Sequence, residues 1–451
     1  MRNRFIRTAY AVFQISLVLF AYLWYRQITY RIVGKGKRRP ALDRVHEKCA
    51  ARLLTTFGRL RGAYIKLGQF LSTQAVLPAP YLVAFSKLQD QVEPVPFFDI
   101  SATVHREWGP GWRDRVKHID ESPLAAASIA QVHRARLADG REVVLKVQYP
   151  GIDELFRKDL RLIAAMYPKF MKAIEMSYPE LRTTIDRDAL VRELFTYIER
   201  ELDYENEVAN QKKMAALFAD WKSVIVPDIV EDLCTRRLIC MSYVEGERIL
   251  DYFDRADQDG RDLMFETLMD FSLYTMVVKG LFQADSHPGN FLVTPDEKLV
   301  VLDFGCIKEL QPAFRKGVIE MVQAYLNRDT RAAAELIWSL GFRTMKQTVD
   351  SLEMWVRFAF EITDTILSHF KEGHDVVAHM QDNLVALSKR FFEMYREHSL
   401  AAVPEEYVLL GRALATPPVP FDKYKPRVDV LPLALEHLAE ASAEEERNAS
   451  E

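Results

Sequence analysis

The sequence predicts an α+β protein of two lobes, in which a strand-rich lobe precedes a helix-rich lobe. The first strong strand pattern is a pair of apolar segments within residues 124–150, joined by ADG, which favours a hairpin turn. Helical periodicity dominates after residue 258, with one further hairpin expected around TPDEK at 294–298. Strands first and helices later favour two lobes, and we expect the site in the cleft between them.

Length and composition exclude few classes of protein. A chain of 451 residues suits one bilobal domain with extensions. A net charge of −4 gives no support to a nucleic-acid binder, because such proteins usually have a basic excess. The four cysteines lack a CxxC pair, so disulfides and a zinc site are not expected.

The N-terminus contains an uncharged run of 18 residues at 8–25. As a helix it would be about 27 Å long, enough to cross a bilayer core. Arginines precede it and six basic residues follow it closely, so the positive-inside bias predicts a membrane-associated protein whose catalytic part is cytoplasmic. A single spanning helix is expected, and a helix lying in the membrane interface is the alternative.

Changes in pattern along the chain suggest five segments. The last of them is acidic and lacks large apolar residues, which predicts disorder. The segments are 1–40, a membrane anchor with a basic juxtamembrane stretch; 41–123, a helical extension; 124–245, the strand-rich lobe with a helical insertion; 246–435, the helix-rich lobe; and 436–451, a disordered tail.

The strongest motif is ADSHPGNFLVTPDEKLVVLDFG at 284–305. Asp285, then Asn290 five residues later, then a hairpin and Asp303 in an Asp-Phe-Gly triplet, is the order found in protein kinases. In that order the first Asp meets the substrate hydroxyl, while Asn and the second Asp hold Mg²⁺. Oxygen ligands of this kind suit Mg²⁺.

Lys146 is the second element of the predicted site. It lies in the apolar run VVLKV, which indicates a largely buried strand. In this order of motifs Lys146 is the candidate to contact the α and β phosphates of ATP.

Several further motifs resemble those of the UbiB family of atypical protein-kinase-like proteins. The resemblance extends over residues 60–310. The motifs are KLGQ at 66–69, LAAASIAQVH at 124–133, LKVQYPG at 145–151, ELDYENEVAN at 201–210, DSHPGN at 285–290 and LDFG at 302–305. The resemblance implies a bilobal protein-kinase-like fold, an ATP and Mg²⁺ site, membrane association and a role supporting ubiquinone biosynthesis.

Carried over by position, the resemblance gives each motif residue a role. Lys146 would pair with Glu201, Asp285 would take the catalytic-loop position, and Asn290 and Asp303 would bind the metal. On an ideal helix Glu201 and Asp203 lie about 200° apart, whereas Asp203 and Glu207 share a face. We therefore expect Asp203 and Glu207 to contact the extension or the metal, or to form a solvated face.

The extension and the connector between the lobes complete the predicted site. Periodicity alone places Lys66 and Gln69 toward solvent, whereas the resemblance directs them into the nucleotide cleft as a regulatory lid. Adenine is expected against main-chain groups of 242–244, namely Ser242, Tyr243 and Val244. Met241 either guards the back of the pocket or belongs to the core.

The loop preceding the first hairpin contains alanines where a phosphate-binding loop usually has glycines. Ala125, Ala126 and Ala127 should make it stiffer, and Ser128 with the following amides could donate to phosphate. Gln283 stands where many kinases have a histidine, so support for the catalytic loop is expected from elsewhere, for example His287.

We therefore expect an atypical kinase or ATPase that uses ATP and Mg²⁺ to support quinone synthesis at a membrane. A membrane lipid or quinone precursor would be its partner, with quinone-biosynthetic enzymes as candidates. The alternatives are a catalytically weak nucleotide-sensing scaffold for lipid-biosynthetic enzymes, or an ordinary protein or small-molecule kinase.

Overall fold

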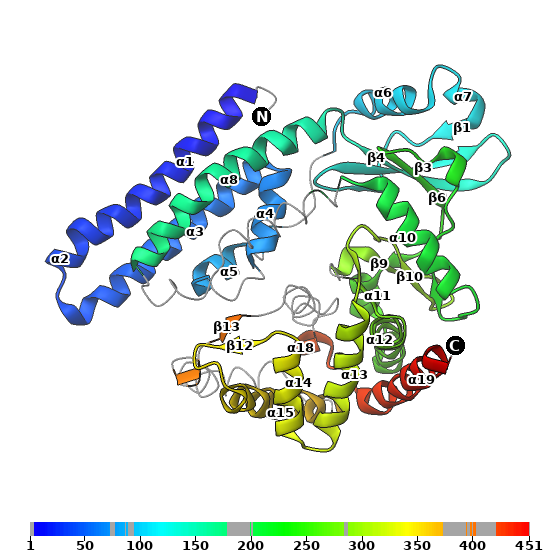
Figure 1. Cartoon of the computed structure of the whole chain (residues 1–451). Coiled ribbons are helices and arrows are strands. Elements are labelled where there is room, and N and C mark those ends of the chain that lie inside the picture. The colour runs from blue at the N-terminus through cyan, green and yellow to red at the C-terminus, as the bar shows by residue number, and fades with distance from the viewer. Residues whose placement is uncertain are drawn as a thin grey trace. The chain divides into compact units, whose positions relative to one another are not determined.

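The computed structural model describes residues 4–72, 77–85, 87–88, 94–177, 199, 202–283, 287–372, 394, 397–398, 400–402 and 421–450. The chain divides into two compact units, each of which is described by itself (Figure 1). The first unit comprises Met1–Ala209 and Asp228–Tyr243, and the second comprises Asn210–Pro227 and Val244–Glu451.

Helices form one part of the first unit. α1 packs against α3 and α8, and α4 packs against α3, α5 and α8 (Figure 1). Arg61 and Gly62 adopt positive φ and separate α3 from α4, and a side chain at Gly62 would crowd the Phe156 ring. The helices are α1 (Arg4–Trp24), α3 (Arg38–Leu60), α4 (Ala63–Ser72), α5 (Ala79–Phe85) and α8 (Ile152–Ser177), with η1 (Tyr25–Thr29) and α2 (Tyr30–Ile32) after α1.

The apolar N-terminal helix has one protein-covered face and one exposed face. Ile6–Ile32 is long and apolar enough to cross a membrane, with a mean hydropathy of 1.5. On the covered face, the Arg7 guanidinium pairs with the Asp159 carboxylate of α8 at 2.6 Å, and both side chains are only 5% exposed. The opposite face exposes Phe13 and Phe20. The structure thus supports an apolar helix that is docked on α3 and α8 along one side.

The second part of the first unit is an antiparallel sheet of order β1-β3-β4-β6, with β2 paired to β3. Its strands are β1 (Val116–Ile119), β2 (Ala125–Ala126), β3 (Ala130–Leu137), β4 (Glu142–Gln148) and β6 (Leu238–Ser242). Gly140, at φ +97°, completes the expected hairpin turn between β3 and β4. Alternate residues of β4 pack into a core with α6 (Phe97–Trp108), which leaves Lys146 on the other face.

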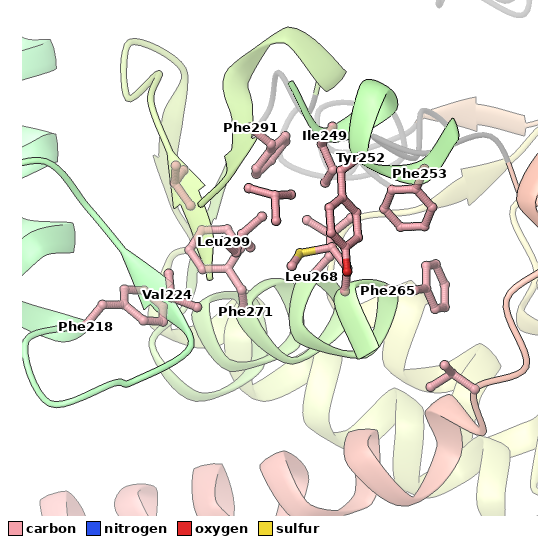
Figure 2. Close-up of a cluster of buried hydrophobic side chains, with 14 of the residues drawn as sticks. Phe218, Val224, Ile249, Tyr252, Phe253, Phe265, Leu268, Phe271, Phe291 and Leu299 are labelled. Atoms are coloured by element: carbon pink, nitrogen blue, oxygen red, sulfur yellow. The ribbon is translucent and has the colours of Figure 1, made fainter. Parts of the chain in front are cut away.

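The second unit is built on a four-stranded sheet of order β5-β10-β9-β7. Figure 2 shows the aromatic and aliphatic side chains that fill the space between its strands and the helices α11 and α12. The elements are β5 (Val224–Ile225), β7 (Glu247–Arg248), β9 (Phe291–Val293), β10 (Leu299–Val301), α11 (Ile249–Arg255) and α12 (Gln258–Leu273). The β9–β10 pair confirms the hairpin expected around TPDEK.

Helices complete the second unit: α13 (Pro312–Leu326), α14 (Thr330–Ser339), α15 (Val349–Glu372) and α19 (Val430–Ser450). The prediction of a disordered tail at 436–451 is wrong for the residues up to Ser450, because α19 continues through them. Leu438 is buried beside Val277, and the Glu444 carboxylate lies 3.0 Å from Lys279 Nζ and 3.1 Å from Arg315 Nη2. The tail is rich in Ala and Glu, which favour helix, and its ion pairs and one buried leucine replace a large apolar face.

Candidate nucleotide site

Lys146 lies on β4 and pairs with a carboxylate of helix α10 (Tyr204–Leu217). Its Nζ is 2.6 Å from Glu207 Oε1, and the two side chains are 16% and 4% exposed. The Tyr204 ring, one turn before Glu207, lies 5.4 Å from the same ammonium group. Lys146 is therefore oriented by α10 rather than extended into solvent.

Among the described residues Lys146 pairs with Glu207, whereas the expected partner Glu201 lies outside them, so that pairing stays a prediction. α10 begins at Tyr204, so the ideal-helix geometry assumed for Glu201 and Asp203 does not apply to Asp203. Asp203 instead caps α10, because its Oδ1 accepts from Asn206 N at 3.1 Å. Asp203 is exposed and Glu207 is buried, so the two carboxylates that were expected to share one face have different environments. An aspartate directly before the helix was the signal that could have located this start.

The alanine loop is a tight turn between β2 and β3. Ala127 N donates to Ala130 O, and Tyr149 holds the turn through its hydroxyl bond to Ala127 O and its amide bond to Ile129 O. None of Ala125, Ala126 and Ala127 has positive φ, so this turn does not require glycine. Ala125 is exposed, whereas Ser128 is buried. The turn is therefore compact, and Tyr149, directly after β4, fixes its position.

The expected adenine-contacting segment follows β6, and the two compact units part between Tyr243 and Val244. Ser242 N donates to Asp228 O and Tyr243 N donates to Glu142 O, so both amides are engaged within the protein. Val244 N has no hydrogen-bond partner among the described residues. Of the main-chain groups predicted to contact adenine, Val244 N and the carbonyls of this segment therefore remain the candidates.

Met241 shares a face of the sheet with Lys146. The register pairs Val144 with Met241 and Lys146 with Ile239, while the intervening Cys240 faces the core shared with α6. The buried Met241 is consistent with a residue at the back of a pocket on this face.

The extension places Lys66 and Gln69 on α4. Lys66 is buried, so the solvent-facing alternative does not hold for this residue. Gln69 Nε2 donates to Leu88 O at 3.3 Å. Gly68 between them is closely packed, since a Cβ there would lie 2.1 Å from Leu88 Cδ1. Close packing around Gly68 therefore restricts how α4 can move.

Asn290 and Asp303 meet at the open end of the β9–β10 hairpin. Asn290 ends the short helix η6 (Pro288–Asn290), and its carbonyl accepts from Leu302 N at 3.0 Å. Asp303 follows Leu302, and its Oδ1 accepts from Gly305 N at 3.0 Å. Phe304 is fully buried, and its carbonyl accepts from Asn210 Nδ2 at 2.9 Å. The hairpin thus places Asn290 and Asp303 at the same end of its two strands.

Gln283 supports the main chain at Asp303, and His287 caps the short helix that contains Asn290. Gln283 ends β8 (Leu281–Gln283), which pairs with β11 (Ile307–Glu309), and its Nε2 donates to Asp303 O. His287 is exposed and caps η6, where its Nδ1 accepts from Gly289 N at 3.0 Å. Asp285 lies outside the described residues.

The donor set of this hairpin fits Mg²⁺. One carboxylate and one amide oxygen, with phosphate oxygens and waters completing the shell, are typical ligands of this ion. In the part of the chain that the structure describes, no three His, Cys, Asp or Glu side chains gather as an all-protein metal site. Asp303 and Asn290 would therefore hold Mg²⁺ together with a bound nucleotide.

Comparison with known proteins identifies the family. The model of the ABC1 atypical kinase-like domain matches residues 87–337, which contain Lys146, Glu207, Asn290 and Asp303. The chain belongs to the ABC1 family of atypical kinase-like proteins. The expected membership of the UbiB family, which includes the ABC1 and AarF-domain proteins, is thereby confirmed.

Two relatives of this ABC1 protein come from a plant and a nematode. It is 34% identical over 313 residues to the chloroplastic ACTIVITY OF BC1 COMPLEX KINASE 3 of Arabidopsis thaliana, covering 69% of this chain and 43% of the plant protein. It is 28% identical to the mitochondrial atypical kinase coq-8 of Caenorhabditis elegans, covering 86% and 51%. The chain spans about half the length of these two relatives.

A solved structure has the same fold as this ABC1 protein. The match is Rv3197 of Mycobacterium tuberculosis, determined in complex with erythromycin. The TM-score is 0.58 at 24% identity, over 90% of this chain and 99% of Rv3197. The predicted kinase-like α+β fold is thus confirmed.

Proposed function

We propose that this protein is a Mg²⁺-dependent ATPase or atypical kinase that supports isoprenoid quinone biosynthesis at a membrane. The observation that supports nucleotide chemistry best is the buried Lys146–Glu207 pair beside Tyr204. A lysine fixed in this way presents its charge at a constant position, which suits a phosphate contact.

Each recurring role in phosphoryl transfer has a candidate residue in this chain. Lys146 would bind the α and β phosphates, and Glu207 would orient Lys146. Asp303 and Asn290 would hold the metal ion, and Gln283 would position Asp303 through its main chain. Bound Mg²⁺ supplies charge neutralisation at the phosphate oxygens. Asp285 stays the candidate for the catalytic-loop position.

The biosynthetic part of the proposal rests on the family and on the N-terminus. One named relative is the mitochondrial atypical kinase coq-8, and the UbiB resemblance implies a role in ubiquinone synthesis. Helix α1 has the length and hydropathy of a membrane helix. A membrane lipid or quinone precursor is the partner that agrees with both.

Phosphate release tests the nucleotide chemistry. In lipid nanodiscs, the full-length protein should release phosphate from ATP in a Mg²⁺-dependent manner, and Asp303→Asn should reduce the rate by at least about 100-fold. Asp296→Asn is the matched control, because Asp296 is an exposed carboxylate at the turn of the same hairpin. Equal rates for Asp303→Asn and the wild type would reject the metal assignment.

Quinone content tests the pathway. A strain that lacks the gene should contain less isoprenoid quinone, and complementation with the wild type or Asp296→Asn should restore it. Complementation with Asp303→Asn should fail if catalysis is required. Restoration by Asp303→Asn would favour the nucleotide-sensing scaffold, and normal quinone in the deletion strain would reject the pathway.

A further inference from the structure

Four helices of the first unit surround a cavity outside the nucleotide-site residues. α1 and α4 each pack against both α3 and α8. The centre of this arrangement is incompletely filled, and the cavity there has a volume of about 50 Å³. This volume is below the range of about 300–1,000 Å³ of pockets that enclose a whole ligand, so the cavity has room for only a few carbon atoms of a longer molecule.

The wall of the cavity consists almost entirely of hydrocarbon. α3 contributes Leu53 and Phe57, α4 contributes Leu67 and Leu71, and Ile163 comes from α8. These side chains are buried within the unit, so their carbon atoms face the cavity rather than the outside of the bundle. A stable water in such a space would need two to four polar partners. The wall therefore suits an apolar occupant.

The position of the cavity indicates the source of that occupant. Ile15 of α1 forms part of the wall, and α1 is the helix with the length and hydropathy to enter a bilayer. The outer face of α1 exposes Phe13 and Phe20. Apolar side chains thus cover both the face of α1 that lines the cavity and its exposed face. A lipid chain that leaves the bilayer beside α1 would contact apolar side chains on the exposed face and again in the cavity.

We propose that this cavity binds the terminal segment of one hydrocarbon chain of a membrane lipid. The chain lies between α1 and α4, against Leu53, Leu67 and Ile163. Occupancy contacts the face of α4 next to Lys66 and Gln69, so the site adjoins the helix of the KLGQ motif. The inference does not rest on the proposed nucleotide chemistry.

Photolabelling in nanodiscs tests the site. The full-length protein is reconstituted with phosphatidylcholine that has a diazirine on one acyl chain, irradiated, and mapped by mass spectrometry. We expect labels on the cavity-lining parts of α3 and α8, which a lipid outside the bundle cannot reach. Labels confined to exposed residues such as Phe13 and Phe20 would overturn the proposal.

Variants that fill the cavity provide the second arm. Ile163→Trp should reduce labelling of α3 by at least about tenfold, while labelling at Phe13 stays unchanged. Met166→Trp, at a half-buried position of the same wall, serves if Ile163→Trp does not fold. Leu263→Trp, at an exposed site in α12, is the matched control. Unchanged α3 labelling in a folded cavity variant would also overturn the proposal.

Competition identifies the type of chain. Excess unlabelled oleate should displace the probe if the cavity prefers an acyl chain, and excess farnesol should displace it if the cavity prefers an isoprenoid. Displacement by either supports a hydrocarbon site. Labelling of α3 that neither competitor reduces would indicate non-specific reaction and would count against the site.

Discussion

Glu207 is the residue at which a single substitution tests the site most directly. Glu207→Gln keeps the size of the side chain and removes its charge, so Lys146 loses the carboxylate at 2.6 Å. The side chain of Lys146 is only 16% exposed, so its partly buried charge loses the carboxylate of Glu207. We expect both stability and nucleotide binding to decrease.

The magnitude follows from the depth of the pair. At 2.6 Å and an effective dielectric constant of about 20, the gross attraction is about 6 kcal/mol, most of which desolvation offsets. Removing one member of a buried pair costs about 3–5 kcal/mol. The ring of Tyr204 and the remaining solvent access favour the lower end, about 3 kcal/mol. For a unit of about 200 residues, this lowers Tm by about 6–12 °C.

The assay is thermal unfolding of the full-length protein in nanodiscs, together with ATP binding followed by a fluorescent nucleotide analogue. Glu205→Gln is the matched control, because Glu205 lies on the same helix but is exposed. It should change stability by less than about 0.5 kcal/mol. The double variant Lys146→Met with Glu207→Leu should regain stability without regaining ATP binding.

Two results would refute this reasoning. If Glu207→Gln melts at the temperature of Glu205→Gln, the Lys146–Glu207 pair does not contribute as a buried ion pair. If Glu201→Gln lowers ATP affinity while Glu207→Gln does not, Glu201 is the functional partner of Lys146, as the resemblance alone implies.

Three further predictions concern other parts of the chain. Burial lowers the pKa of His46 to about 4, so the unfolded chain binds a proton that the folded chain does not between about pH 6.5 and 4. The unfolding free energy should therefore fall by about 2 kcal/mol from pH 7 to pH 5. Denaturant titration should show that this pH dependence is absent in His46→Gln and retained in His118→Gln, whose histidine is exposed. In the same titration, Leu438→Ala should destabilise the second unit by about 2 kcal/mol, because Leu438 is buried. Leu435→Ala, at an exposed position of the same helix, should leave stability unchanged. If neither variant changes stability, the tail does not pack as α19 and the prediction of disorder would stand. Ala126→Gly should lower the unfolding free energy by about 0.5–1 kcal/mol. It should also change the relative affinities for ATP and ADP, and the rate of self-phosphorylation relative to that of the native activity. Unchanged nucleotide affinities would contradict the role assigned to the alanines.

Patterns that depend on neighbouring residues were predictable. The hairpin turn before Arg141 and the hairpin around TPDEK follow from turn chemistry and alternation, and both are present. The motif spacing was also informative, because Lys146 lies within strand β4 as expected and Asn290 and Asp303 flank the β9–β10 hairpin. The α19 tail was misjudged because its few apolar contacts are supplemented by ion pairs with distant residues.

The sequence by itself determined the family, the α+β class, the apolar N-terminal helix and the motif residues, since each depends on residue types at short or fixed spacing. Only the tertiary structure decided that Glu207 pairs with Lys146, that Gln283 supports Asp303, and that Lys66 is buried. Periodicity predicts which residues lie on the same face of a helix or strand. It does not predict which other element packs against that face. Lys146 and Glu207 are 61 residues apart in the sequence, and only the packing of their two elements brings them together. A buried charge requires an opposite charge nearby, and tertiary packing determines which residue supplies it.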